Sequence, residues 1–393
     1  MPTADVVVIG GGVNGSSIAY HLAKAGVKNV TLVERAHLGS GASGKSGALV
    51  RMHYTNPYES KLAYESLKIF SNWDEIVGGD CGFQPIGFFQ VVAPEYEEQL
   101  RQNVTDQQRI GIKTQVITAE EMQKIEPEAN IEGLTYVAYE PESGFADPNA
   151  TTYAFAKRAR ELGVNVMTHT TVTTIRTEKD RVVGVDTTAG PIDAPTVVLA
   201  GGAWADRLLK PLGLDLGLIS YRSQVVIFRR PYGSRGPRNV FIDTVANSWF
   251  RPEGESGILI GAESGGTGVD PDGFNETVDG DQVEMARGKL ATRFPSTREA
   301  TMRGGWAGMY MLSPDHHPII DQPPSTPGLF IMAGDSGTSF KTSPAIGKCM
   351  SEWITGGEPV TADLTPFRAS RFAEGKPWHD ETNYGYRNRT ISR

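Results

Sequence analysis

Three glycines and one acid near the start of the chain have the types and spacing with the clearest chemical meaning. Gly10, Gly12 and Gly15 follow an apolar run at residues 6–9, and Glu34 ends a second apolar run. Such glycines let a backbone turn tightly and approach a pyrophosphate, whose charge the N–H groups of the next helix then bind. An acid about 20 residues farther on accepts hydrogen bonds from ribose hydroxyls. The unit therefore predicts dinucleotide binding.

The segment that follows Glu34 indicates which dinucleotide is bound. Residues 39–51 are small and polar and carry almost no bulky side chain, so this segment can run as a loop along a long ligand. Ser40, Ser43 and Ser46 offer hydroxyl groups to phosphate or ribityl oxygens. These features favour FAD over NAD.

Two further strand–glycine–helix units occur much later in the chain. One spans residues 194–209 and turns at Gly201 and Gly202, and the other spans 328–354 and turns at Gly334 and Asp335. The N-terminus of the last helix, near residue 343, could face an anion. Three such units separated by long insertions predict one discontinuous dinucleotide domain.

The elements that must position these residues fall into two predicted domains and a tail. Apolar spacing and capping residues predict helices over 59–73, 96–110, 118–125 and 147–162, and a strand-rich stretch over 219–261. The last residues lack apolar periodicity. The predicted division is an FAD-binding domain of 1–85, 145–215 and 304–376, a substrate-binding domain of 86–144 and 216–303, and a polar C-terminal tail of 377–393.

Composition excludes several classes of protein. The net charge of −8 over 393 residues disfavours nucleic-acid binding. Cys81 and Cys349 form no disulfide framework or metal-ligand cluster, and the adjacent His316 and His317 would point apart. No apolar run approaches the roughly 18 residues of a membrane span. The first strand begins at about residue 4, which leaves no room for a signal peptide, so we expect a cytoplasmic protein.

Five motifs together resemble a known family. They read GGGVNGSSIAYHLAKAG, GASGKSGALVR, LAGGAWADRL, MLSPDHHPIID and GLFIMAGDSGTSFKTSPAIGK, and they lie in order over nearly the whole chain. They resemble the D-amino-acid-oxidase family of FAD-dependent oxidoreductases, in its sarcosine oxidase and glycine oxidase branch. The resemblance implies an α/β fold: a Rossmann-like FAD-binding domain of the glutathione-reductase type, with an inserted α+β substrate domain on a mostly antiparallel sheet.

The resemblance also implies which residues contact FAD. The glycines match the pyrophosphate turn, Glu34 matches the ribose acid, and Val172 lies where a strand meets the adenine. The turn after Gly334 matches the segment facing the ribityl chain and the pyrimidine edge. The full set is Gly10, Gly12, Val13, Asn14, Gly15, Glu34, Arg35, Ser43, Ser46, Gly47, Ala48, Leu49, Val172, Ala200, Gly201, Trp204, Gly334, Asp335, Gly337, Thr338, Ser339, Phe340 and Lys341.

Three residues match the substrate site of sarcosine oxidases. The resemblance implies that Arg51 and Lys341 hold the substrate carboxylate and that Tyr310 lies above the flavin. Two cations on one carboxylate would align its α C–H with flavin N5. Gly308 stands where monomeric sarcosine oxidases carry the cysteine that binds flavin, so we expect noncovalent FAD. Leu259 stands where they carry a lysine thought to assist reaction with oxygen, which leaves oxygen or an electron carrier as acceptor.

We therefore expect FAD-dependent oxidation of the amine of a small amino acid to an imine, with hydride transfer to flavin N5 and sarcosine as the best single substrate. One alternative is a dehydrogenase of the same fold that acts on proline, dimethylglycine or a 2-hydroxy acid and reduces a quinone or carrier. An NAD-dependent reductase and a non-catalytic flavin-binding module are further alternatives. The oligomeric state stays open.

Overall fold

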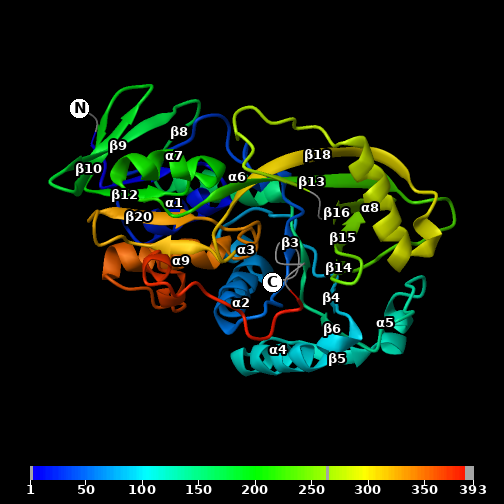
Figure 1. Ribbon diagram of the computed structural model, residues 1–393. Coiled ribbons are helices and arrows are strands. Elements are labelled where there is room, and N and C mark those ends of the chain that lie inside the picture. Colours follow the sequence, from blue (N-terminus) through cyan, green and yellow to red (C-terminus); the bar gives the residue numbers. More distant parts are fainter. Residues whose placement is uncertain (1–2, 263–264, 386–393) are drawn as a thin grey trace.

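The computed structural model describes residues 3–262 and 265–385, and within these ranges six strands form the first sheet (Figure 1). Neighbouring strands are parallel except for the antiparallel pair at one edge. The strands, in spatial order, are β19 (Ile319–Asp321), β20 (Leu329–Ala333), β12 (Thr196–Leu199), β1 (Val6–Ile9), β2 (Val30–Val33) and β8 (Asn165–Met167).

The central strand of this sheet is buried on both faces, because its side chains alternate between two cores. Val6 and Val8 pack with the helices α1 (Val13–Lys24), α6 (Pro148–Glu161) and α9 (Ser343–Gly356). Val7 and Ile9 pack instead with α7 (Ala205–Leu209) and a small antiparallel sheet. That sheet consists of β9 (Val172–Glu178), β10 (Arg181–Thr187) and β11 (Ile192–Asp193).

A larger sheet occupies the other half of the molecule and, over the described ranges, contains nine strands. All its pairs are antiparallel except β14 with β4. Its strands are β18 (Thr301–Leu312), β13 (Ile219–Arg229), β17 (Gly266–Thr267), β16 (Gly257–Ala262), β15 (Ser248–Glu253), β14 (Val240–Asp243), β4 (Phe88–Val91), β6 (Tyr136–Glu140) and β5 (Gln115–Thr118).

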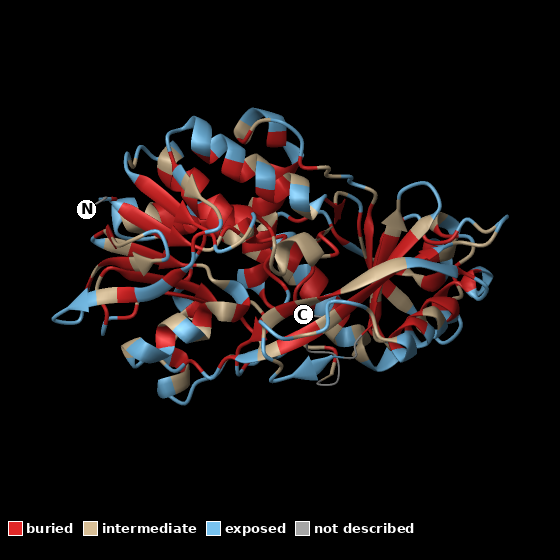
Figure 2. Ribbon diagram, turned by 90° about the horizontal axis from the view of Figure 1, so that it is seen from above, coloured by how far each residue is buried: buried red, intermediate tan, exposed pale blue. Residues whose placement is uncertain are grey.

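Helices cover the larger sheet on the side away from the first sheet. The helix α8 (Gly280–Arg293) buries Val283, Ala286 and Leu290 against strand side chains such as Phe241 and Phe250. In Figure 2 buried residues, coloured red, predominate in the strands of both halves of the molecule. The other helices are α2 (Pro57–Ser71), α3 (Trp73–Ile76), α4 (Glu97–Ile110), α5 (Ala119–Ile125) and α10 (Ser370–Ala373). No helix in the described part of the chain is long and apolar enough to cross a membrane.

The strand β18 lies differently from the division predicted at residue 304. It pairs with β13 from Thr301 opposite Arg229 to Leu312 opposite Ile219, so residues 304–312 belong to the larger sheet by hydrogen bonding. A strand of this length runs from one half of the molecule into the other, and a boundary drawn along the chain cannot describe it.

The segment after residue 377, predicted as a polar tail, packs against other parts of the molecule where the structure describes it. The Trp378 indole stacks on the His317 ring, with 4.3 Å between ring centroids. Tyr384 is fully buried, and its hydroxyl lies 2.6 Å from His53 Nε2. Trp378 and Tyr384 therefore anchor this segment to the rest of the molecule, although its composition is mostly polar. The predicted tail continues over 386–393, outside the described residues.

Candidate cofactor and substrate site

A cavity of about 500 Å³ lies where the first sheet, the larger sheet and the loop after β2 meet. This volume is typical of small-molecule sites. Of the residues predicted to contact FAD or substrate, Gly15 alone is outside the lining. The predicted residues that line the cavity are Gly10, Gly12, Val13, Asn14, Glu34, Arg35, Ser43, Ser46, Gly47, Ala48, Leu49, Arg51, Val172, Ala200, Gly201, Trp204, Tyr310, Gly334, Asp335, Gly337, Thr338, Ser339, Phe340 and Lys341.

The first glycine turn has no room for side chains. Gly10 has φ +105°, and a Cβ there would lie 2.3 Å from the carbonyl oxygen of Ala200. A Cβ on Gly15 would lie 1.9 Å from the carbonyl oxygen of Gly10. Gly15 thus lets α1 pack closely on β1 and shapes the turn from behind, which explains why it does not line the cavity.

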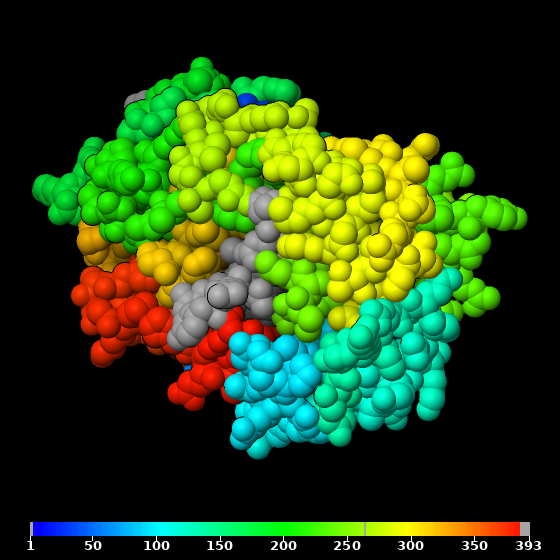
Figure 3. All heavy atoms as spheres, turned by 45° about the vertical axis from the view of Figure 1, so that its right-hand side comes forward, coloured from blue at the N-terminus to red at the C-terminus, as the bar shows by residue number. Residues whose placement is uncertain are grey.

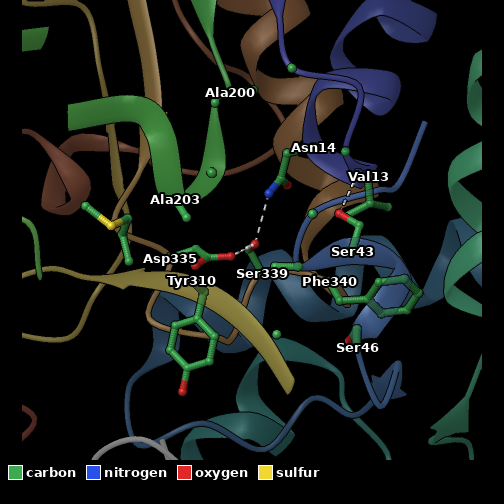
Figure 4. A pocket seen from close by; sticks show the side chains of 18 of the residues that line it. Val13, Asn14, Ser43, Ser46, Ala200, Ala203, Tyr310, Asp335, Ser339 and Phe340 are labelled. Atoms are coloured by element: carbon green, nitrogen blue, oxygen red, sulfur yellow. Dashed lines mark hydrogen bonds between the residues drawn. The ribbon is translucent and has the colours of Figure 1, made fainter. Parts of the chain in front are cut away.

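Polar groups from three segments converge at the N-terminus of α1 (Figure 4). The backbone N–H of Val13 donates to Ser43 Oγ at 2.9 Å. Asn14 Nδ2 donates to Ser339 Oγ, which in turn donates to Asp335 Oδ2, at 2.9 and 2.6 Å. The first turn of α1 and the turn after β20 therefore face each other. The positive end of the helix dipole and several hydroxyl groups are available there to an anionic, hydroxyl-bearing ligand.

Glu34 is buried at the end of β2 and lines the cavity. Its Oε2 accepts a hydrogen bond from the Gly11 N–H at 2.7 Å, and its Oε1 accepts one from the Ala36 N–H at 2.8 Å. Because each carboxylate oxygen has a second acceptor site, Glu34 can bind ribose hydroxyls while it holds the turn.

A group of side chains around Asp272, which no local sequence motif predicts, lines the cavity together with Glu34. Asp272, in the loop between β17 and α8, accepts hydrogen bonds from Arg35 Nη1 at 2.8 Å and Trp204 Nε1 at 2.7 Å. Arg207 also pairs with Asp272, and the Arg35 guanidinium lies 3.7 Å from the Trp204 ring centroid. Hydrogen bonds from Arg35, Arg207 and Trp204 hold the pKa of Asp272 well below its usual range.

The loop that carries Asp272 belongs to the larger sheet, whereas its three partners belong to the first sheet and its connections. In Figure 3 the yellow-green segment of this region lies between the green and yellow surfaces of the two halves. The loop therefore connects the halves across one end of the cavity.

Two buried cations line the cavity and pack on the same aromatic ring. Arg51 follows β3 (Leu49–Val50), and Lys341 lies in the turn before α9. The Arg51 guanidinium carbon and Lys341 Nζ lie 4.7 and 4.9 Å from the centroid of the Tyr54 ring. Both Lys341 Nζ and the Tyr54 hydroxyl donate to the Thr338 carbonyl oxygen at 3.0 Å. Packing on one aromatic ring fixes both cations at the cavity wall.

A buried acid lies behind this pair. Glu140, at the end of β6, is fully buried, and its Oε2 accepts hydrogen bonds from the Met52 N–H at 2.9 Å and Ser143 Oγ at 2.5 Å. Burial raises the pKa of Glu140, while Met52, Ser143 and the charges of Arg51 and Lys341 oppose that rise. The sequence marks Glu140 only as an acid ending an apolar strand, and its proximity to the cations depends on the fold.

The histidine next to these cations is neutral over the physiological range. Burial, reinforced by the nearby Arg51 charge, lowers the pKa of His53 to about 3. His53 therefore adds no third charge behind the cavity wall.

The larger sheet forms the opposite wall through β13, β14, β15 and β18. Tyr310 packs against the turn after β20, because a Cβ on Gly337 would lie 2.9 Å from its ring. The Tyr221 ring lies 5.2 Å from that of Tyr310 on the neighbouring strand. Ser223, Val225, Ile242 and Trp249 complete this wall; the sequence analysis did not single out any of them.

Gly308 and Leu259 occupy different environments. Gly308 lines the cavity, and a Cβ there would lie 3.2 Å from Lys45 Cβ. Lys45 also lines the cavity and forms an ion pair with Glu276 at 2.8 Å. Leu259 is buried within β16 and does not line the cavity.

The donor set fits FAD. A glycine turn too crowded for side chains meets the N-terminus of α1, an acid suited to ribose lies at one side, and hydroxyls from two loops face the middle of the cavity. These features match the pyrophosphate, ribose and ribityl parts of a dinucleotide in that order. Arg51 and Lys341 line the same cavity.

Comparison with curated proteins finds relatives of similar sequence. The chain is 27% identical over 387 residues to the β subunit of sarcosine oxidase from Rhodobacter capsulatus. The match covers 95% of this chain and 89% of that protein. It is also 27% identical over 409 residues to mitochondrial dimethylglycine dehydrogenase from Rattus norvegicus. There the match covers 98% of this chain but only 47% of the relative, so the chain spans about half the length of that protein.

Comparison with solved structures and family models identifies the fold. The crystal structure of L-proline dehydrogenase from P. horikoshii superposes with a TM-score of 0.89 at 26% identity, covering 96% of this chain and all of that one. The expected α/β fold class is thereby confirmed. The model of the family described as DAO, FAD dependent oxidoreductase, matches residues 5–353. The chain belongs to this family, as its motifs led us to expect.

Proposed function

We propose that the protein oxidises the amine of a small amino acid to an imine with noncovalently bound FAD. The proposal is carried by the pairing of Arg51 and Lys341 on the Tyr54 ring at the end of the cavity beyond the dinucleotide features. Two buried cations at one point of a cavity wall suit a carboxylate, since charge-assisted hydrogen bonds are strong where water is excluded. A sarcosine-like N-methyl amino acid is the preferred substrate.

The chain's own residues bind and orient the substrate. Arg51 and Lys341 hold the carboxylate, which leaves the α carbon and the nitrogen projecting into the cavity. Holding the reacting carbon in one position supplies much of the entropic part of catalysis. FAD, when bound, supplies the acceptor for the electron pair that leaves the C–N unit of the substrate. The imine is then hydrolysed in solution.

The wall of the larger sheet supports oxidation of an amine that has already lost its proton. Its side chains, Ser223, Val225, Ile242, Trp249 and Tyr310, include no carboxylate that would stabilise a substrate ammonium group. A protonated amine is therefore disfavoured beside this wall and the two cations by desolvation and like charge. The neutral amine requires no general base to remove a proton before oxidation.

The decisive experiment is an anaerobic screen with the FAD-loaded protein. Bleaching of the flavin absorbance near 450 nm would be followed for N-methyl amino acids, cyclic imino acids, D-amino acids and 2-hydroxy acids. We expect sarcosine or a close N-alkyl amino acid to bleach the flavin fastest, and decarboxylated amines to fail. Bleaching by 2-hydroxy acids alone would overturn the amine assignment. Failure of the whole panel would favour a flavin-binding module without catalysis.

A dehydrogenase that passes electrons to a quinone or protein carrier is the second candidate. The names of both a dimethylglycine and a proline dehydrogenase among the similar proteins favour it. Leu259, which does not line the cavity, gives no evidence on the electron acceptor. Steady-state oxygen uptake compared with reduction of an artificial quinone, on the best substrate of the screen, separates an oxidase from a dehydrogenase.

A further inference from the structure

A tryptophan of the larger sheet is held against the cavity in a space made by two glycines. A Cβ on Gly47, in the loop along the cavity, would lie 2.2 Å from the Trp249 ring, and a Cβ on Gly261 would lie 2.3 Å from it. Gly47 and Gly261 come from distant parts of the chain. The indole therefore fills a slot between the loop and the sheet that exists only because both positions lack side chains.

The strand register explains why this indole faces the cavity. Trp249 on β15 is paired directly with Gly261 on β16 and with Ile242 on β14. Gly261 in turn is opposite Val225 on β13. Directly paired residues share one face of a sheet, and Ile242, Trp249 and Val225 all line the cavity. Trp249 covers the space above Gly261 and is the largest side chain in this row.

Trp249 belongs to the substrate end of the cavity. It packs on a buried apolar cluster that contains Phe88 and Ile242 and has Leu49 at its edge. The Arg51 guanidinium lies 5.9 Å from the centroid of the Phe88 ring, so the same cluster supports one of the two cations that we assign to the carboxylate. The neighbouring Arg251 Nε donates to the Gly47 carbonyl oxygen at 2.8 Å and ties β15 to the loop.

We propose that Trp249 is the specificity-determining residue that limits the size of the group carried on the substrate nitrogen or α carbon. This inference rests on the proposed function, because it assumes a carboxylate held by Arg51 and Lys341. The indole offers a flat apolar wall to that group, suited to a methyl substituent or a saturated five-membered ring. Larger acyclic or aromatic substituents meet the ring, which the two glycines hold in place.

Two substitutions should change the size limit in opposite directions. Trp249→Ala removes the wall and enlarges the substrate end. Gly261→Ala adds a Cβ 2.3 Å from the indole, so the ring must shift, and with Gly47 on its other side the free direction is towards the cavity. Gly261 does not have a positive φ, so alanine adds no backbone strain there. Trp249→Phe is the conservative variant, and Trp353→Ala, on α9 away from the cavity, controls for loss of a tryptophan.

The test measures binding without turnover. Unreactive carboxylates of increasing size, from acetate through butyrate to phenylacetate, would be titrated into each FAD-loaded protein, with the flavin absorbance change giving Kd. Flavin content and thermal unfolding would be recorded for every variant. We expect Trp249→Ala to tighten binding of phenylacetate relative to acetate by tenfold or more, Gly261→Ala to weaken butyrate several-fold, and Trp249→Phe to keep the wild-type order.

Turnover of sarcosine, N-propylglycine and N-benzylglycine would complete the test. Trp249→Ala is expected to reverse the wild-type order of kcat/KM through KM, and Trp353→Ala to leave it unchanged. If carboxylates bind but the size profile of Trp249→Ala matches the wild type, the assignment of Trp249 is wrong. If no carboxylate perturbs the flavin in any variant, the carboxylate site itself, and with it the proposed function, is wrong.

Discussion

Arg51 and Lys341, far apart in the sequence, stand over the same aromatic ring, with the guanidinium carbon 4.7 Å and the ammonium nitrogen 4.9 Å from the centroid of Tyr54. Both are almost completely buried, and Glu140 is the buried acid behind them. Two cations facing one buried acid leave an excess positive charge at the cavity wall when Glu140 is ionised. A substrate with one carboxylate neutralises that excess.

The first prediction tests this pair directly. Arg51→Ala and Lys341→Ala should each lower kcat/KM. The loss of transition-state stabilisation should be about 2–5 kcal/mol, because removing one member of a buried charge cluster leaves the substrate carboxylate poorly paired. The loss should appear mainly in KM. The double variant should cost less than the sum of the two, since both residues act on one group.

Conservative variants separate charge from packing at these positions. Arg51→Lys and Lys341→Arg keep the charge, so their kcat/KM should fall less than that of the alanine variants. Lys341→Met keeps the approximate length of the side chain without the charge, so its kcat/KM should fall as much as that of Lys341→Ala. Lys113→Ala, at an exposed lysine, is the control. Wild-type kcat/KM on an amino acid in both single alanine variants would exclude the carboxylate assignment.

The second prediction concerns the link between protein and flavin. Gly308 stands where monomeric sarcosine oxidases carry the cysteine that binds flavin. Cys81 and Cys349 are both buried, and desolvation is the main cause that raises their thiol pKa values to about 12. A thiol held in the protonated form is a poor nucleophile. Acid precipitation should therefore release yellow FAD into the supernatant. A yellow pellet would show covalent attachment through another residue.

The third prediction concerns Glu34. Because its two oxygens hold the Gly11 and Ala36 N–H groups, Glu34→Ala should loosen the turn as well as remove the ribose acceptor. We expect FAD affinity, titrated into apoprotein, to fall by on the order of 1.5–3 kcal/mol. Glu34→Gln, which keeps an oxygen acceptor in place, should lose less. Equal affinity in wild type and Glu34→Ala would mean that Glu34 does not bind the ribose.

Local sequence signals identified much of this architecture, because their physical causes are local. The glycine turn at Gly10, the capping box at Thr118 and the apolar strands all follow from neighbouring residues, and the structure contains the capping box with both of its hydrogen bonds. The expected cofactor residues were likewise assigned from short motifs of consecutive residues. Such features can be read without knowing what packs against them.

The features that sequence analysis missed join distant segments. Asp272 binds Arg35 and Trp204 beside the cavity, and Glu140 lies near Arg51 because its side chain accepts the Met52 N–H from a distant part of the chain. Trp249 faces the cavity because its cross-strand partner is a glycine. Tertiary pairing of this kind leaves no periodic or compositional trace. Tyr384, in the predicted polar tail, likewise finds its partners His53 and Asn103 in distant segments.

The fourth prediction tests Asp272 as a connection across the cavity. Exposed ion pairs contribute little singly, but here two arginines and an indole converge on one carboxylate. Asp272→Asn should accelerate FAD dissociation several-fold, measured by the recovery of flavin fluorescence after dilution. High salt should accelerate release from the wild type and have less effect on the variant. Asp270→Asn is the matched control, because it removes the charge paired with Arg207 and keeps a side-chain oxygen for the Asp272 N–H. Identical release rates in wild type and Asp272→Asn would show that the loop does not retain FAD.

The last prediction concerns stability at acid pH and rests on His53. Its pKa is lowered from 6.5 to about 3 in the folded protein, because it is buried and lies near Arg51. Below pH 6.5 the unfolded chain therefore binds a proton that the folded protein does not, and stability falls as the pH drops towards 3. The slope from this one group approaches about 1.4 kcal/mol per pH unit.

Replacing the histidine by a neutral side chain should reduce that slope. Urea unfolding of the FAD-loaded protein at several pH values between 7.5 and 4 measures it. His53→Gln keeps a polar group near the Tyr384 hydroxyl, so it should lose some stability at pH 7.5 but decline less steeply with acid. His21→Gln offers an independent comparison, since burial lowers the pKa of His21 to about 3 as well. If both variants show the wild-type slope between pH 7.5 and 4, the buried histidines do not cause the acid sensitivity. Asp315 cannot explain a slope in this window: Arg371 holds its pKa near 2 although burial raises it, so it would act only below about pH 4.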